Sequence, residues 1–226
     1  MIEIKRILLN LKTTLFLISG IFLITLTCSN HKKTKQYTQS EIDSLKNEFI
    51  QYCQTKDDEF KNADWSPLTP GDKVSFGALN YFDYDITFRY QLKINTYDNQ
   101  DTIEVTGSKA GDLRKAVRYG YFDFKRDAHI NRLEVWKMMP RKDSDEAHLF
   151  VGFWDATSGQ ETYPGGRYLD IQELEEDIYL LDFNYAYNPY CAYGPTWNCP
   201  ITPSENRLKI AIRAGEKLPD ETWVIK

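Results

Sequence analysis

The feature that most constrains this chain is an alternation of apolar and polar side chains that begins at residue 86. The apolar positions are Ile86, Phe88, Tyr90, Leu92 and Ile94, and each residue between them is polar. Because successive side chains of a strand point to opposite faces of a sheet, this alternation is typical of a strand with one buried face. Similar patterns predict further strands at 102–106, 115–124, 131–138, 147–154, 167–172, 178–184 and 206–213.

The connections between these strands are short and contain Gly, Asp or Asn, which favours antiparallel neighbours. Residues 98–101, Asp-Asn-Gln-Asp, are typical of a hairpin turn, so we expect strand 86–94 to pair with strand 102–106. A hydrophobic fraction of 42% is enough to bury a core. The expected fold is therefore mainly β, an antiparallel barrel or sandwich, because both architectures give the same alternation.

One amphipathic helix is predicted before the strands, over residues 39–62. Thr38 and Glu41 have the spacing of a capping box, which satisfies two free backbone amides at a helix start. Apolar side chains then recur with helical period at Ile42, Leu45, Phe49, Tyr52, Cys53 and Phe60. The charged residues of the helix, Lys56 among them, are expected to be largely solvated. Two prolines in the segment 65–71 end the helix.

The N-terminal segment is typical of an export signal. Residues 1–12 carry three basic side chains, and residues 13–27 contain no charge. This uncharged run is short for a spanning helix, which needs about 20 apolar residues. Cys28 follows directly, an arrangement that resembles the lipobox of bacterial lipoproteins. We therefore predict a lipoprotein-type signal peptide over residues 1–27 and a membrane anchor on acylated Cys28.

Two alternatives remain open for this segment, an uncleaved anchor or a secreted protein with an unmodified thiol. In the lipoprotein case residues 28–38 form a polar tether, and residues 39–226 form a single β-rich domain facing the periplasm or the cell exterior.

The chain has 28 basic and 33 acidic residues, a formal net charge of −5. Because nucleic-acid binding needs clustered Lys and Arg, no nucleic-acid partner is expected.

Polar side chains become dense from residue 153 onward. The segments concerned are 153–159, 161–170, 181–193, 199–200, 205–208 and 214–216. Together with residues 66–68, 76–77 and 81–82, they resemble an uncharacterised family of bacterial envelope proteins, domain of unknown function 1684, over roughly residues 45–218. The resemblance implies domain boundaries and an envelope location, but no particular activity.

Asp155 and Asp182 are candidates for the centre of a site. If strands at 150–155 and 180–184 pair, these carboxylates meet at one sheet end, where they could act as acid and base or bind a divalent cation. Arg167 would bind a carboxylate or phosphate through two hydrogen bonds. The predicted ligand-binding residues are Asp155, Arg167, Asp182, Asn184, Tyr187, Asn188 and Asn206, and the catalytic candidates are Asp155, Asp182 and Glu161.

The same residues also have a purely structural interpretation. Asp155 begins a turn sequence and would cap its own following amides. Asn184 and Asn188 would satisfy the backbone of a loop that a proline interrupts. Arg167 would then pair with Asp155 or Asp182 inside the protein. The two interpretations differ in whether an open cavity lies beside these groups.

The cysteines give one further prediction. Cys191 and Cys199 enclose seven residues and would form a disulfide in an oxidising compartment, which would stabilise the fold by about 2.6 kcal/mol in the chain-entropy model. Cys53 lies on the apolar stripe of the helix and is expected to be a small buried hydrophobe. The cysteines and three histidines match no zinc motif, and the chain contains no serine-hydrolase or metalloprotease motif.

Three functions are therefore compatible with the sequence. The first is an exported, lipid-anchored envelope protein that binds a small polar or anionic ligand in a cleft built from the C-terminal polar residues. The second is a carboxylate-based or metal-assisted hydrolase or transferase, with a divalent cation as its cofactor. The third is a structural module that contacts other envelope proteins. An open cavity beside Asp155, Arg167 and Asp182 would favour the first two.

Overall fold

The strands form two antiparallel sheets in the computed structural model, which describes residues 35–141, 146–175, 177–194 and 196–219. The predicted signal peptide and Cys28 lie outside the described residues. Among the residues that are described, no helix is long and apolar enough to cross a membrane.

The larger sheet has the order β2-β4-β5-β6-β7, and β3 also pairs with β4. The central part of this sheet is the hairpin of β4 and β5. In its register Ala116 pairs with Met138 at one end, and Arg126 pairs with His129 at the turn. Its strands are β2 (Asn95–Thr96), β3 (Thr102–Thr106), β4 (Leu113–Arg126), β5 (His129–Met138), β6 (His148–Phe153) and β7 (Arg167–Asp170).

The smaller sheet has the order β1-β9-β8 and consists of β1 (Arg89–Lys93), β9 (Ile178–Asp182) and β8 (Gln172–Glu175). The main core lies between the two sheets, where apolar side chains of both are buried together. Its members include Phe122, Leu133, Val151 and Phe153 from the larger sheet, Leu181 from β9, and Phe183 directly after β9. The mainly β prediction is confirmed, and the described strands form a sandwich-like pair of sheets and not a closed barrel.

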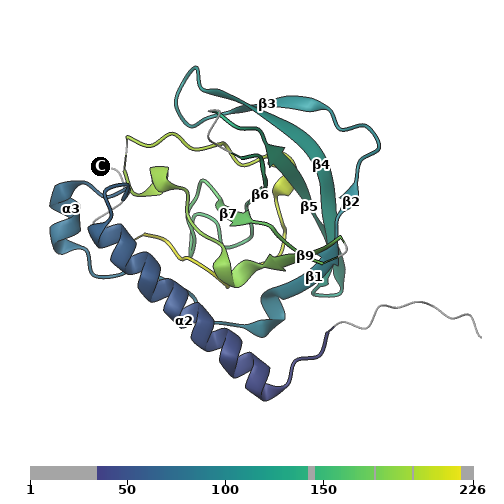
Figure 1. Ribbon diagram of the computed structural model, residues 1–226, viewed down its shortest axis with the longest axis horizontal. Coiled ribbons are helices and arrows are strands. Elements are labelled where there is room, and N and C mark those ends of the chain that lie inside the picture. Colours follow the sequence, from purple (N-terminus) through teal and green to yellow (C-terminus); the bar gives the residue numbers. More distant parts are fainter. Residues whose placement is uncertain (1–34, 142–145, 176, 195, 220–226) are drawn as a thin grey trace, which may run out of the picture. The chain divides into compact units, whose positions relative to one another are not determined.

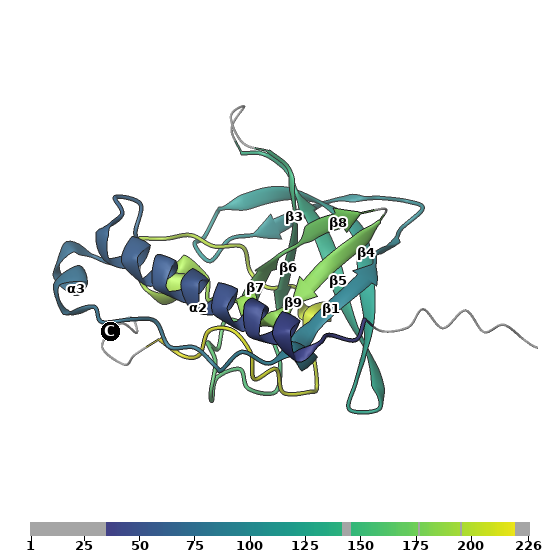
Figure 2. The ribbon, with the colours of Figure 1, turned by 60° about the horizontal axis from the view of Figure 1, so that its bottom comes forward.

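The predicted helix is α2 (Gln39–Asn62), with the predicted bounds. Its capping box is present: the Glu41 amide donates to the Thr38 hydroxyl, and the Thr38 amide donates to the Glu41 carboxylate at 2.7 Å. Phe49 and Phe60 are the buried side chains of its apolar stripe. Figures 1 and 2 show α2 lying outside the sheets, with the short helix α3 (Pro70–Ser75) beside its C-terminal end. A proline at the first turn of α3 is compatible with a helix, because that amide needs no helical partner.

The predicted hairpin of strands 86–94 and 102–106 is wrong. Residues Ile86–Phe88 form a 3-10 turn, and β1 pairs with β9, with Tyr90 opposite Leu181. β3 pairs with β4, and β2 pairs with another part of β4. The strands on either side of the turn at 98–101, β2 and β3, therefore both pair with the long strand β4, and β1 pairs elsewhere.

The strand predicted at 206–213 is also absent, and this segment is irregular. Its backbone bonds to loops and side chains instead of to a neighbouring strand. Arg167 donates to the Ile212 carbonyl at 2.8 Å, and the Ile212 amide donates to the Asp155 carboxylate at 3.3 Å. Its apolar residues Leu208 and Ile212, and Ala214 just after it, are nevertheless buried in the main core.

Candidate functional site

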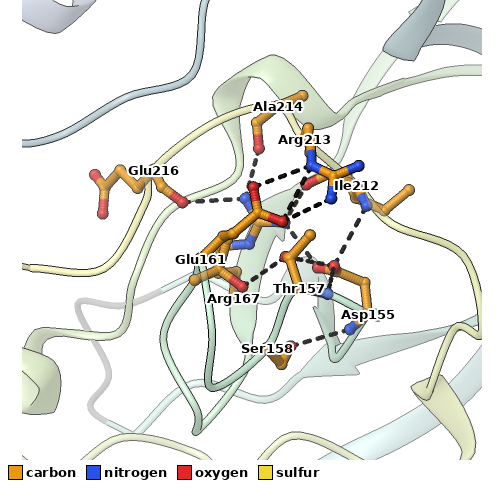
Figure 3. A network of polar contacts seen from close by, with 10 residues as sticks. Asp155, Thr157, Ser158, Glu161, Arg167, Ile212, Arg213, Ala214 and Glu216 are labelled. Atoms are coloured by element: carbon orange, nitrogen blue, oxygen red, sulfur yellow. Dashed lines mark hydrogen bonds and ion pairs between the residues drawn. The ribbon is translucent and has the colours of Figure 1, made fainter.

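Asp155 and Arg167 form a buried ion pair at the ends of β6 and β7. Arg167 Nη2 donates to Asp155 Oδ2 at 2.8 Å, and each side chain is 1% exposed. Arg167 also donates to the carbonyls of Ile212, Ala214 and Glu216, as Figure 3 shows. Burial lowers the pKa of Arg167, although the charge of Asp155 opposes that change. This guanidinium is surrounded by the protein's own acceptors.

The second oxygen of Asp155 is occupied as well. Oδ1 accepts hydrogen bonds from the Thr157 amide at 2.7 Å and from the Thr157 hydroxyl at 2.5 Å. The carboxylate therefore caps the turn that follows β6, as the structural interpretation of this residue required.

Asp182 lies in the other sheet, so the predicted pairing of strands 150–155 and 180–184 is wrong. Its cation is Arg89, whose Nη1 donates to Asp182 Oδ2 at 2.5 Å, and not Arg167. Asp182 Oδ1 accepts from both the amide and the side chain of Asn184. Asn184 in turn bonds both backbone groups of Asp85 at 2.9 Å. The predicted carboxylate pair is two separate ion pairs in two sheets.

Asn188 and Asn206 lie in segments near the C-terminus that are not strands, and their side chains hydrogen-bond to neighbouring segments. Asn206 accepts from the Glu134 amide at 2.7 Å and donates to two carbonyls. The Asn188 side chain donates to Tyr193 and to the Lys217 carbonyl. Glu161 is outside this buried set, since it pairs at 2.8 Å with Arg213, whose side chain is 60% exposed. Asn188 and Asn206 therefore make buried contacts that stabilise the fold, whereas Glu161 makes an exposed surface pair.

Tyr187 is the predicted residue that lines all three of the hollows described below. It lines a cavity of about 620 Å³, which we call the Tyr187 cleft and whose lining includes Tyr52, Lys56, Trp65, Arg114, Asp170, Tyr190 and Trp197. Tyr187 also lines two neighbouring hollows of about 470 and 500 Å³. Asp182 and Arg89 border the second of these. The open space thus lies beside the buried polar residues described above, and Tyr187 is the predicted site residue that lines all of it.

Lys56 supplies a positive charge at this cleft. Its Nζ lies 2.6 Å from Glu216 Oε1 and 4.7 Å from the ring centroid of Tyr187, and its side chain is 11% exposed. Burial opposes the charge of Lys56, but the Glu216 carboxylate outweighs it and raises the pKa of Lys56. The prediction that Lys56 is solvated is therefore wrong. Its place four residues after Tyr52 and four before Phe60, on the apolar stripe, is the signal that would have identified it.

Aromatic rings form one wall of the Tyr187 cleft. The Trp65 and Tyr190 rings are stacked with centroids 6.0 Å apart, and Trp197 meets Tyr190 edge-on at 4.9 Å. Trp65 is 45% exposed. At the other side Arg114 is held by Asp112 at 2.8 Å, and the Tyr187 hydroxyl donates to Asp170 at 3.2 Å. Sequence patterns gave no signal for Trp65, Arg114 or Trp197, because two loops and the start of β4, far apart in the chain, bring them together.

Cys191 and Cys199 lie beside this wall and are both free thiols in the structure. The Cys191 amide donates to Cys199 Sγ at 3.3 Å. Within the described part of the chain, no three His, Cys, Asp or Glu side chains are grouped to hold a metal ion. The divalent-cation alternative therefore has no ligand set among these residues.

Comparison with known proteins places the chain among uncharacterised relatives. The model of the family described as "Protein of unknown function (DUF1684)" matches residues 74–217. The solution NMR structure of an uncharacterised protein from gene locus rrnAC0354 of Haloarcula marismortui is similar, with a TM-score of 0.59 and 28% identity. That similarity covers 80% of this chain and 97% of the archaeal one. No curated protein matches.

Proposed function

The chain belongs to the DUF1684 family of proteins of unknown function, and we propose that it is a binding protein that holds a small ligand in the Tyr187 cleft. The ligand has a flat apolar part, which stacks on the aromatic wall, and an anionic group, which Lys56 and Arg114 attract. The observation that carries this proposal is the placement of a buried ammonium group at the edge of an aromatic cavity of about 620 Å³.

The dimensions and lining of the cleft support a small ligand. Pockets for small molecules have volumes of about 300–1,000 Å³ and are lined by apolar and aromatic side chains with a few polar groups. The outer face of Trp65 is available, since that residue is 45% exposed and stacks on Tyr190 with its inner face. A planar ring in the ligand would continue this stack.

The charges at the cleft favour an anionic group. Glu216 accepts hydrogen bonds from the Asn188 amide at 2.7 Å and from the Tyr193 hydroxyl at 2.9 Å, in addition to its ion pair with Lys56. Lys56 Nζ also donates to the Tyr52 hydroxyl at 3.5 Å, so that with Glu216 and Tyr52 as partners one of its three N–H groups is left for another acceptor. Glu59 and Asp170 also line the cleft, which favours a ligand with hydroxyl or amide donors besides its anion.

The carboxylate-based enzyme is less well supported. Asp155 and Asp182 each have a separate cation and separate backbone donors, so neither is placed to act as an acid–base pair with the other. The purely structural module is also less well supported, because it does not account for a cavity that combines aromatic rings with two cations.

A fluorescent aromatic anion, 1-anilinonaphthalene-8-sulfonate, tests the proposal. We expect the purified chain to bind it in one saturable site, and Trp65→Ala to weaken binding about tenfold through the lost stacking. Arg114→Gln should also weaken it. Ile130→Ala is the matched control, since Ile130 is 76% exposed and lies outside the cleft. Equal affinities for Trp65→Ala and Ile130→Ala would contradict the proposal.

We further propose that the protein is an exported lipoprotein of the bacterial envelope, anchored through Cys28. The basic flank, the uncharged run of residues 13–27 and the position of Cys28 support this. In a bacterial host that expresses the whole chain, labelled fatty acid should enter the protein, and Cys28→Ser should abolish the labelling. Unchanged labelling in Cys28→Ser would refute the anchor.

A further inference from the structure

The two cysteines at the cleft wall are held by separate parts of the backbone. Cys191 lies in the 3-10 turn Tyr190–Ala192. Cys199 is fixed next to Ser108, whose amide donates to the Cys199 carbonyl at 2.8 Å and whose hydroxyl accepts from the Cys199 amide at 3.1 Å. The Cys191 amide donates to Cys199 Sγ at 3.3 Å, so the Cys199 sulfur lies against the backbone of Cys191. The two cysteines are therefore side by side in the folded chain.

We infer that Cys191 and Cys199 form a reversible thiol–disulfide pair whose oxidation fixes the aromatic wall of the Tyr187 cleft and strengthens ligand binding. The second half of this inference rests on the proposed function. Cys199 itself lines the cleft, Tyr190 precedes Cys191, and Trp197 lies two residues before Cys199. A covalent link between the cysteines would restrain both wall residues at once.

The surroundings of the two thiols give them different roles. Hydrogen bonds with Cys199, Ser108 and Tyr163 lower the pKa of Cys191 to about 7, although burial opposes this. The hydrogen bond with Cys191 and burial raise the pKa of Cys199. Because the thiolate is the nucleophile, Cys191 is the attacking thiol and Cys199 is the resolving one. Cys191 is also partly exposed, whereas Cys199 is buried.

The oxidant is a low-molecular-weight disulfide such as oxidised glutathione. The Cys191 thiolate attacks one sulfur of that disulfide, so that a mixed disulfide forms and one small thiolate leaves. Cys199 then loses its proton and attacks the Cys191 sulfur, which forms the Cys191–Cys199 bond and releases the second small thiolate. The protein loses two electrons and two protons, and the small disulfide becomes two thiols.

The full chain, reduced and then treated with oxidised glutathione, tests the pair. After alkylation of the remaining thiols, peptide mass spectrometry should show a bond between Cys191 and Cys199 and a free Cys53. Cys199→Ala should stop at the mixed disulfide on Cys191. Oxidation should raise the Tm by about 5–10 °C, from the closed nine-residue loop. Absence of the internal bond, or an unchanged Tm, would overturn the pair.

The pH dependence of alkylation gives a second readout. As pH rises through about 7, Cys191 converts to the thiolate, so its alkylation rate should increase and then level off. Cys53 is the matched control, because burial raises its pKa to about 12 and its rate should stay low over that range. Equal pH profiles for the two cysteines would overturn the assignment of Cys191 as the nucleophile.

Binding of the sulfonate probe to both redox forms tests the coupling to the cleft. We expect the oxidised chain to bind at least threefold more tightly, and oxidised and reduced Cys191→Ala to bind alike. Equal affinities of the two wild-type forms would overturn the coupling. If neither form binds the probe, the proposed function and the coupling both fail, while the bond and the Tm still decide the redox pair.

Discussion

Arg167 is the largest of the completely buried side chains in the described chain. Its guanidinium donates to the Ile212 carbonyl, in the segment where the last strand was expected, to two carbonyls just after that segment, and to the carboxylate of Asp155. Carbonyls without a ladder partner need other donors when they are buried, and a guanidinium supplies five N–H groups in a fixed plane. At the residue scale, Arg167 thus supplies the hydrogen-bond donors that a neighbouring strand would otherwise supply to these carbonyls.

Asp155→Asn should therefore destabilise the protein strongly. The substitution keeps an acceptor for the Thr157 amide but removes the charge that Arg167 faces. Breaking a buried ion pair from one side costs about 3–5 kcal/mol. We expect a loss of this size in the free energy of unfolding, measured by urea denaturation.

Glu161→Gln is the control for that prediction. Glu161 makes the same kind of contact with Arg213, at the same distance of 2.8 Å, but this pair is solvent-exposed. Exposed pairs contribute little, so the urea midpoint should stay nearly unchanged. Similar midpoints for Asp155→Asn and Glu161→Gln would show that Arg167 does not depend on its carboxylate.

At the scale of elements, β4 organises the larger sheet because two short strands share one of its edges. β2 meets Gly120 and Tyr121, and the register of β4 against β5 shifts between Arg118 and Gly120. A side chain at Gly120 would point at β2, since an added Cβ would lie 2.5 Å from the Asn95 carbonyl oxygen. The close approach of β2 therefore requires glycine here.

Gly120→Ala should cost about 1–3 kcal/mol of unfolding free energy, because the backbone of β2 must move to make room. Gly77→Ala is the matched control, since a Cβ there meets nothing within 4 Å. That change should be neutral or slightly stabilising through the lower entropy of the unfolded chain. Thermal unfolding of both variants checks the difference, and equal Tm values would contradict the tight packing of β2.

The elements also show how far sequence patterns reach. The bounds of α2 and most strands followed from local signals, namely the capping box and the period of two. The partners of each strand did not follow, because alternation states which side chains are buried and not which strand lies alongside. Residues 98–101 have good turn chemistry, yet the strands on either side of them pair with β4 and not as predicted.

The candidate site could be predicted only in part for the same reason, since a sequence pattern does not state which residues lie side by side. The density of polar groups after residue 153 correctly marked where buried polar contacts lie, but density does not distinguish groups that face each other from groups that face a ligand. Tyr187 was among the predicted residues and lines the cleft, whereas Trp65 and Arg114 line it and were not predicted, because residues far apart in the chain meet there only after folding.

At the scale of the whole molecule, the pair of Lys56 and Glu216 joins the N-terminal helix to the C-terminal segment. Its atoms lie 2.6 Å apart, and the side chains are 11% and 1% exposed. Around it, α2 packs through rings on the chain after β9, with Tyr52 and Tyr185 centroids 4.9 Å apart. The pair thus connects α2 to the C-terminal segment beside the Tyr187 cleft.

A double-mutant cycle measures how strongly Lys56 and Glu216 stabilise each other. Lys56→Met and Glu216→Gln should each lower the free energy of unfolding, Lys56→Met by about 3–5 kcal/mol because it leaves a buried carboxylate unpaired. The double variant should lose less than the sum, with a coupling energy of about 1–3 kcal/mol. Lys93→Met is the control, since Lys93 is 53% exposed and lies 3.9 Å from Asp177, so its effect should be close to zero. If the two losses simply add, Lys56 and Glu216 do not stabilise each other, and the pair does not couple α2 to the C-terminal segment.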